Sequence, residues 1–140
     1  MISVVPDPSV LVAAFLSRGG EGASAELIRL WIDGGLAFVV SPHLVHELRS
    51  VLLRPEFRRT ATAEQVLAYV AFIQDYGILQ EDVPSPDSVS RDQTDDYWLA
   101  LARAAHADFI ISFDKDLLEL EGQDLPILRP GELLWRMRAS

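Results

Sequence analysis

Short runs of apolar residues alternate along the chain with longer segments in which apolar residues recur every three or four positions. The runs predict strands at 2–6, 36–40, 78–79, 109–112 and 125–128. The periodic segments predict helices at 8–16, 23–33, 42–52 and 62–76, and two more that begin at 94 and 130. Strands that alternate with helices favour an α/β fold, here a three-layer α/β/α sandwich with a mainly parallel central sheet.

Polar residues mark where several of these helices begin. Asp7 and Ser41 each precede a proline, which suits a capping residue followed by the first helical position. Thr62 with Gln65 has the spacing of a capping box. Asp7 has two interpretations at this point. It is a plain helix cap, or it is a ligand-binding carboxylate, because ligands bind at the carboxyl ends of strands in open α/β sheets.

Acidic residues gather on both sides of the predicted strand 109–112. Asp92, Asp95 and Asp96 surround the start of the helix before it, and Asp114 and Asp116 follow it. A helix dipole stabilises a first-turn acid by about 0.3–1 kcal/mol, which explains one of the first three comfortably but the whole set less well.

Topology predicts that some of these acids meet. Right-handed crossovers place the carboxyl ends of parallel strands at one edge of the sheet, where Asp7, Asp114 and the helix start with Asp95 converge. Glu47 borders the apolar stripe of helix 42–52 and can approach the same edge, although a border glutamate is more often simply solvated.

Four carboxylates in one pocket repel one another unless a cation joins them. Mg²⁺ and Mn²⁺ prefer oxygen ligands, and one or two such ions can polarise a phosphodiester and activate a water molecule. The sequence has no supporting pattern for a Ser–His–Asp triad or a lysine nucleophile. The acids therefore favour metal-assisted phosphodiester hydrolysis.

Composition narrows the class of protein further. The 140 residues suit a single domain, 1–140, with a well-filled core. Cysteine is absent, which excludes disulfides, thiolate zinc sites and a cysteine nucleophile. No apolar run reaches the roughly 18 residues of a spanning helix, so we expect a soluble, cytoplasmic protein without a membrane partner. The net charge of −9 argues against a broad, non-specific grip on nucleic acid.

The order of these motifs resembles that of a known family. The stretches that carry the resemblance are Asp7 after the first strand, Ser41-Pro42 through Glu47-Leu48, Arg91-Asp92 through Asp95 before Leu99-Ala100-Leu101-Ala102, and Ala107-Asp108-Phe109-Ile110-Ile111-Ser112-Phe113-Asp114-Lys115-Asp116. Together they look like a PIN domain, and more narrowly like the VapC-like toxin ribonucleases of bacterial toxin–antitoxin pairs. The resemblance spans essentially the whole chain.

The resemblance implies Mg²⁺- or Mn²⁺-dependent cleavage of RNA, a cognate antitoxin protein and a homodimer. By position, the residues that match the family's catalytic and metal-binding acids are Asp7, Glu47, Asp95 and Asp114. Those expected to assist are Ser9, Asp96, Ser112 and Asp116. Asp95 is chosen over Asp96 by its spacing to Ala102. The chain departs from the family at Asp7-Pro8-Ser9, where Asp-Thr-Asn is usual.

Three alternatives stay open. A receiver-like signalling domain would need a second acid after the first strand and a lysine near the last one, and neither is present. A haloacid-dehalogenase-type phosphatase would need an aspartate where Ser9 stands. A catalytically weak PIN fold would only bind a partner protein. Such a partner, like an antitoxin, would lay an apolar or basic segment across the helices.

Overall fold

The computed structural model describes residues 1–82, 96–114 and 125–139. Within these residues, five strands form one parallel sheet in the order β3-β2-β1-β4-β5. The strands are β1 (Ile2–Pro6), β2 (Leu36–Val40), β3 (Ile78–Leu79), β4 (Phe109–Ile111) and β5 (Ile127–Leu128). The central strand β1 pairs with β2 on one side and with β4 on the other.

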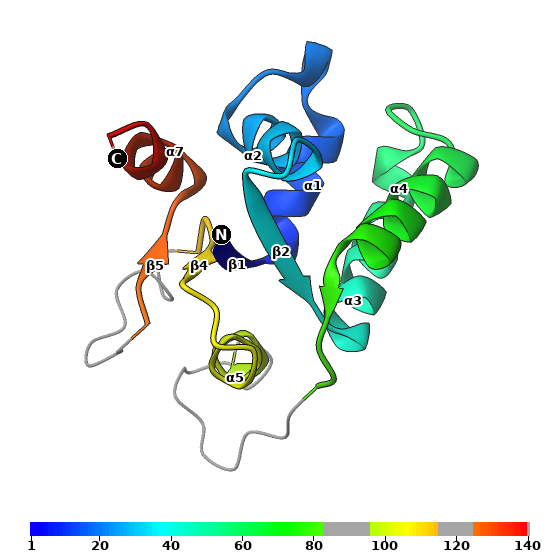
Figure 1. Ribbon diagram of the computed structural model, residues 1–140. Helices are drawn as coiled ribbons and strands as arrows, with labels where there is room; N and C mark the ends of the chain where they lie inside the picture. The colour runs from blue at the N-terminus through cyan, green and yellow to red at the C-terminus, as the bar shows by residue number, and fades with distance from the viewer. Residues whose placement is uncertain (83–95, 115–124, 140) are drawn as a thin grey trace.

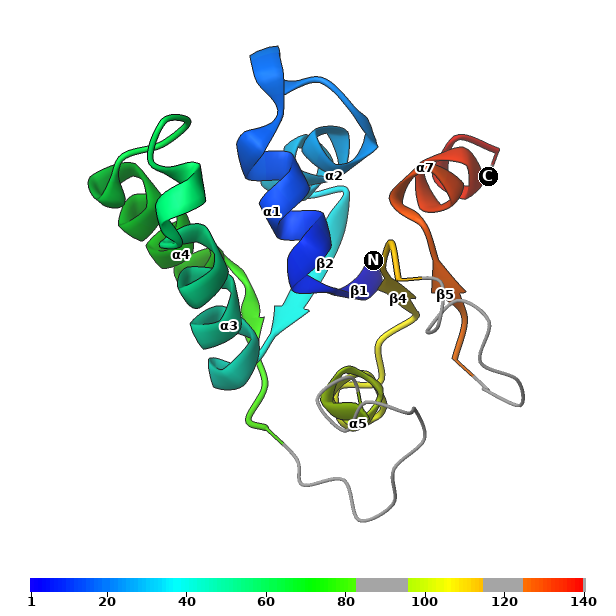
Figure 2. The ribbon, with the colours of Figure 1, turned by 180° about the vertical axis from the view of Figure 1, so that it is seen from behind.

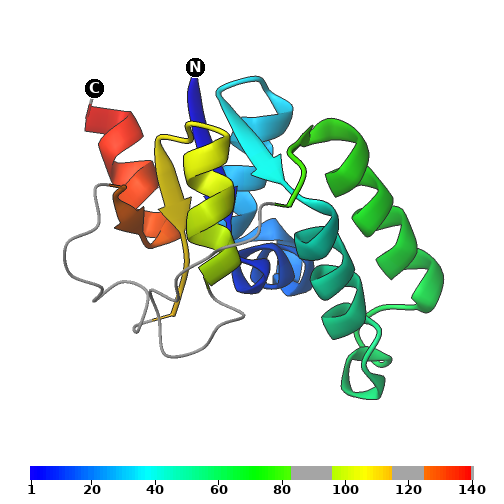
Figure 3. The same ribbon diagram turned by 90° about the horizontal axis from the view of Figure 1, so that it is seen from below.

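Helices cover both faces of this sheet, as the predicted three-layer sandwich requires. They are α1 (Pro8–Leu16), α2 (Ala23–Ile32), α3 (Pro42–Leu52), α4 (Ala63–Tyr76), α5 (Asp96–Ala104) and α7 (Pro130–Ala139). Figure 1 shows α5 on one side of the sheet, with α1, α2 and α7 on the other. Seen from below, α5 runs alongside β1 and β4 (Figure 3). None of the described helices is both long and apolar enough to cross a membrane.

The core lies where the sheet meets its two helical layers. Val4 and Val5 of β1 and Ile110 and Ile111 of β4 have no exposed surface. Consecutive buried residues are expected in a parallel strand that is covered on both faces. The apolar runs in the sequence therefore correspond to the central strands, and the α/β/α fold class is confirmed.

The predicted capping residues begin their helices as expected. The Asp7 side chain caps α1 by accepting from the Ser9 backbone N–H, and Ser41 caps α3 by accepting from Leu44 N. Thr62 and Gln65 form both hydrogen bonds of a capping box at α4. These caps fix the point at which the chain turns from each strand or loop into the following helix.

The structure departs from the sequence prediction in small ways. The connection between α1 and α2 contains a 3₁₀ turn, Arg18–Gly20, in which Gly19 and Gly20 adopt the positive φ angles that glycine tolerates best. A second 3₁₀ turn, Pro55–Phe57, follows α3. The last strand is Ile127–Leu128, shorter than the predicted 125–128, because Pro126 has no N–H to donate to the ladder.

Candidate active site

Two neighbouring strands bring the first two site residues together. β1 and β4 are adjacent and parallel, so Asp7 follows β1 at the same edge of the sheet at which Ser112 follows β4. The backbone N–H of Asp7 donates to the carbonyl of Ile111 at 2.9 Å and extends the ladder by one bond. Figure 2 shows α1 leaving this end of β1, with α3 beside it.

Asp7 is a nearly buried carboxylate, with 4% of its surface exposed. Its Oδ2 accepts from the Ser112 hydroxyl at 2.6 Å, and its Oδ1 accepts from the Ser9 N–H at 3.0 Å. Burial raises the pKa of Asp7 above its ordinary value, and the nearby charge of Glu47 adds to the rise. The bonds from Ser112 and Ser9 lower that pKa but do not cancel the effect of burial. Asp7 is therefore a helix cap, as the first interpretation states, and it is also a buried acid. That it binds a ligand stays a prediction.

Ser112 connects Asp7 to Asp114. Ser112 is fully buried. Its hydroxyl oxygen accepts a hydrogen bond from the Asp114 backbone N–H at 2.9 Å, and the same hydroxyl group donates a hydrogen bond to Asp7. This pair of bonds fixes the turn that follows β4 and links the backbone of half-buried Asp114 to the Asp7 carboxylate through one hydroxyl group. The hydroxyl residue and the two aspartates expected at this edge are thus brought together.

Glu47 approaches the edge from α3, as the sequence suggested. It is half-buried, and its charge is close enough to Asp7 to affect the pKa of that residue. Ser41, fully buried at the end of β2, starts α3 and so positions Glu47. Ser9, in contrast, is exposed and reaches Asp7 mainly through its backbone N–H, with a smaller effect of its side chain on the Asp7 pKa.

Tyr97, which the sequence interpretation missed, completes the arrangement. It lies in the first turn of α5, and its hydroxyl donates to Oε2 of Glu47. Burial, the hydrogen bond to Glu47 and the charges of Glu47 and Asp7 raise the pKa of Tyr97, so the phenol remains a proton donor. The signal in the sequence was a hydroxyl directly after the acids that open this helix, and the sequence interpretation assigned no role to it.

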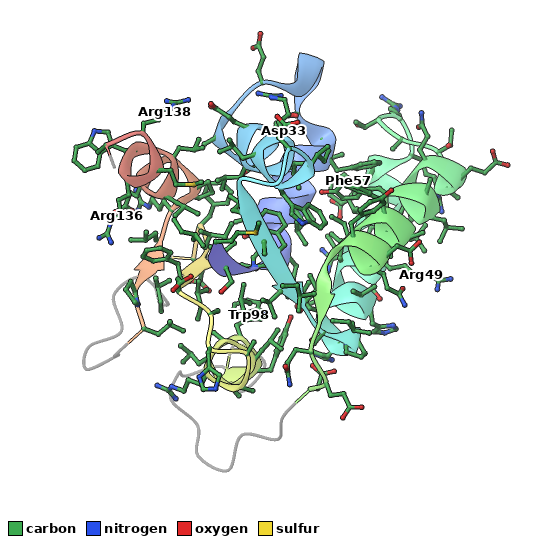
Figure 4. The ribbon with its side chains drawn as sticks, in the orientation of Figure 1. Asp33, Arg49, Phe57, Trp98, Arg136 and Arg138 are labelled. Atoms are coloured by element: carbon green, nitrogen blue, oxygen red, sulfur yellow. The ribbon has the colours of Figure 1, made fainter. Side chains whose placement is uncertain are left out.

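Two histidines of α3 lie near this site. His43 and His46 are exposed, and the His43 ring packs edge-on against Tyr97 with ring centroids 4.4 Å apart. Trp98 lies between α5 and the sheet (Figure 4). Its buried indole N–H has no hydrogen-bond partner of good geometry among the described residues. The indole N–H is still near enough to the Tyr97 hydroxyl to lower the pKa of Tyr97 slightly against the larger effects that raise it.

Several expected site residues cannot be placed. Asp92, Asp95 and Asp116 lie outside the described residues, as does the side chain of Asp96. Among the side chains that are described, no three histidines, aspartates or glutamates are close enough to hold a metal ion together. The structure thus brings three of the four predicted acids to one edge of the sheet, but the described part of the chain holds no closed metal site.

The chemistry of the placed residues nevertheless fits a divalent cation. Asp7, Glu47 and Asp114 offer only carboxylate oxygens, the ligands that Mg²⁺ and Mn²⁺ prefer. Asp7 accepts hydrogen bonds from Ser9 and Ser112, and Glu47 accepts one from Tyr97; all three donors are neutral. Because burial penalises the charge on Asp7, a cation at this edge would relieve an unfavourable interaction that hydrogen bonds alone leave in place.

Comparison with known proteins identifies the family of the chain. The structure is similar to the crystal structure of PAE2754 from Pyrobaculum aerophilum, with a TM-score of 0.66 over 99% of this chain and 91% of that one; at 17% identity, the likeness shows the fold alone. No curated protein sequence matches the chain. A PIN domain family model matches residues 3–116. That match spans most of the chain, which therefore belongs to the PIN domain family, whose members are generally nucleases that use divalent metals.

Proposed function

We propose that this PIN domain is a ribonuclease that depends on Mg²⁺ or Mn²⁺ and hydrolyses RNA phosphodiester bonds. The observation that carries the proposal is Asp7, a carboxylate buried at the carboxyl end of the central strand, with its pKa raised by burial and by Glu47. A protein keeps such a buried charge at a cost to stability, which is a common property of catalytic and metal sites.

In this proposal Asp7, Glu47 and Asp114 hold the cation, with Asp95 as a fourth ligand. A bound divalent cation supplies Lewis-acid polarisation of the phosphodiester and lowers the pKa of a water molecule. The residues of the chain have their own tasks. Ser112 orients Asp7 and the backbone of Asp114, and the Ser9 N–H holds the second Asp7 oxygen. Asp96 and Asp116 are the acids that we expect to assist.

The test is cleavage of a mixed RNA pool by the purified protein in Mn²⁺, in excess chelator, and with the variant Asp114→Asn. We expect cutting in Mn²⁺ that is lost in both controls. The substitution keeps the shape of the side chain and the backbone N–H that Ser112 accepts, so a loss of cutting reports the charge. Cutting that persists in chelator would contradict the metal requirement.

The alternative that remains is a catalytically weak PIN domain that only binds a partner. The family match sets aside the receiver-like and phosphatase alternatives. Ser9, which replaces the usual asparagine, is the feature that favours a weakened site. A weak site would still bind Mn²⁺ in calorimetry while cutting no RNA. A purely structural role would be indicated by no Mn²⁺ binding and by full partner binding in Asp7→Asn.

We further propose that the chain is the toxin of a toxin–antitoxin pair and works as a homodimer. The support is the order of its motifs, which is similar to that of VapC-like ribonucleases. Expression of the wild type should then arrest bacterial growth, and Asp7→Asn should not. Light scattering on the purified protein should give twice the 15.6 kDa mass of one chain. Because the chain has a net charge of −9, we expect the antitoxin protein to bind it through a basic segment.

A further inference from the structure

Tyr97 links the helix that covers one face of the sheet to the helix that carries Glu47. Its hydroxyl donates to Oε2 of Glu47, and its ring meets the edge of His43 at 4.4 Å between centroids and an interplanar angle of 89°. His43 and Glu47 are four residues apart on α3 and so share one face of that helix. The tyrosine therefore contacts two points of the same helical face.

Glu47 needs such a partner more than Asp7 does. Asp7 is nearly buried and short, and two hydrogen bonds hold its two oxygens. Glu47 is only half-buried and has a longer side chain, whose rotamers must be restricted before it can act as a ligand. The Tyr97 hydroxyl bonds to Oε2, and Oε1 accepts no hydrogen bond from the residues that the structure describes.

We propose that Tyr97 is a positioning residue that holds the Glu47 carboxylate toward Asp7 and so sets the affinity of the acidic edge for a divalent cation. The inference rests on the function proposed above. It assigns to each of the two acids one hydroxyl donor, Ser112 for Asp7 and Tyr97 for Glu47. Partners of metal ligands commonly have this role, because they fix the direction of the ligand before the metal binds.

Replacement of the tyrosine by phenylalanine tests the role of the hydroxyl alone. Tyr97→Phe keeps the ring that packs against His43 and Trp98 and removes only the donor to Glu47. We expect calorimetry to show Mn²⁺ binding weakened by about 10–100-fold, the range typical for loss of such a partner. Unchanged Mn²⁺ affinity would overturn the proposal.

Tyr69 provides a matched control. Like Tyr97 it is half-buried, and its hydroxyl donates to the backbone carbonyl of Leu11 at 2.7 Å, with no carboxylate involved. Tyr69→Phe thus loses a hydrogen bond of the same kind at a different place. We expect its Mn²⁺ affinity to equal that of the wild type. An equal loss in both variants would show a general effect of destabilisation and would overturn the positioning role.

A second measurement needs no metal. Denaturant unfolding of Tyr97→Phe, Glu47→Ala and the double variant forms a thermodynamic cycle in chelator. We expect the double variant to lose less stability than the two single losses predict, because both remove the same hydrogen bond. Additive losses would overturn the proposal.

If the wild type binds no Mn²⁺, the proposed function is wrong. If the wild type binds Mn²⁺ and Tyr97→Phe binds it equally, only the role of Tyr97 is wrong.

Discussion

The pH dependence of stability follows from the environment of Asp7. Burial raises its pKa in the folded state above the ordinary value of 3.8, so the folded chain takes up this proton at a higher pH than the unfolded chain does. The charged carboxylate therefore costs stability at neutral pH, and that cost disappears as the pH falls through the folded-state pKa. The wild type without metal should gain stability relative to Asp7→Asn on acidification. Urea unfolding of both proteins in chelator at several pH values measures their free energies of unfolding. If the value for the wild type minus that for Asp7→Asn stays constant or decreases as the pH is lowered, the raised pKa is contradicted.

Ser112 should matter for both stability and metal binding. Ser112→Ala removes the donor to Asp7 and the acceptor of the Asp114 N–H at a fully buried position. We expect a loss of about 1–3 kcal/mol in the free energy of unfolding, because buried polar groups remain without partners. Mn²⁺ affinity should fall by about tenfold or more.

Ser24 is the matched control for that substitution. It is also buried, but its hydroxyl has no hydrogen-bond partner among the described residues. Ser24→Ala removes the same atom without breaking a bond, so we expect little change or a gain in the free energy of unfolding. Equal losses in Ser24→Ala and Ser112→Ala, measured by denaturant unfolding, would contradict the importance of the Ser112 hydrogen bonds.

At the scale of elements, the helix that carries Glu47 depends on its cap. Ser41→Ala leaves the N–H of Leu44 without its partner at a fully buried site, whereas Thr62→Ala opens an exposed cap at α4. Loss of a cap lowers the free energy of unfolding by about 0.5–2 kcal/mol. We expect a loss near the upper end of this range for Ser41→Ala, because its cap is buried, and near the lower end for Thr62→Ala, because its cap is exposed. Denaturant unfolding compares them, and a larger loss in Thr62→Ala would contradict this order.

Elements were predictable from the sequence wherever local chemistry decides the structure. The apolar runs identified the buried strands, and Ser41 with Pro42 identified the start of α3, because strand burial and caps leave short-range patterns. The contact of Tyr97 with Glu47 was not predictable, because it joins residues 50 positions apart through the approach of α5 to α3. Proximity of Asp7 and Ser112 was predictable from topology, but their hydrogen bond depends on side-chain directions that no sequence pattern fixes.

At the scale of the whole molecule, metal binding should appear as added stability. The chain carries a net charge of −9, and a cation at the acidic edge would bind the folded state, in which the acids are together. Mn²⁺ at about one hundred times its dissociation constant adds about 2.7 kcal/mol to the free energy of unfolding. We expect the midpoint of thermal unfolding to rise in the wild type and not in Asp7→Asn. An equal rise in both proteins would place the cation elsewhere.

The most direct test of the acidic edge as a metal site is anomalous X-ray scattering from a crystal of the wild-type protein soaked in Mn²⁺. We expect an anomalous peak in contact with an Asp7 carboxylate oxygen and with Glu47 or Asp114 as well. No peak at this edge, with manganese bound at another acid such as Asp82 or Asp108, would show that the carboxyl ends of β1 and β4 are not a metal site and would remove the basis for the proposed nuclease.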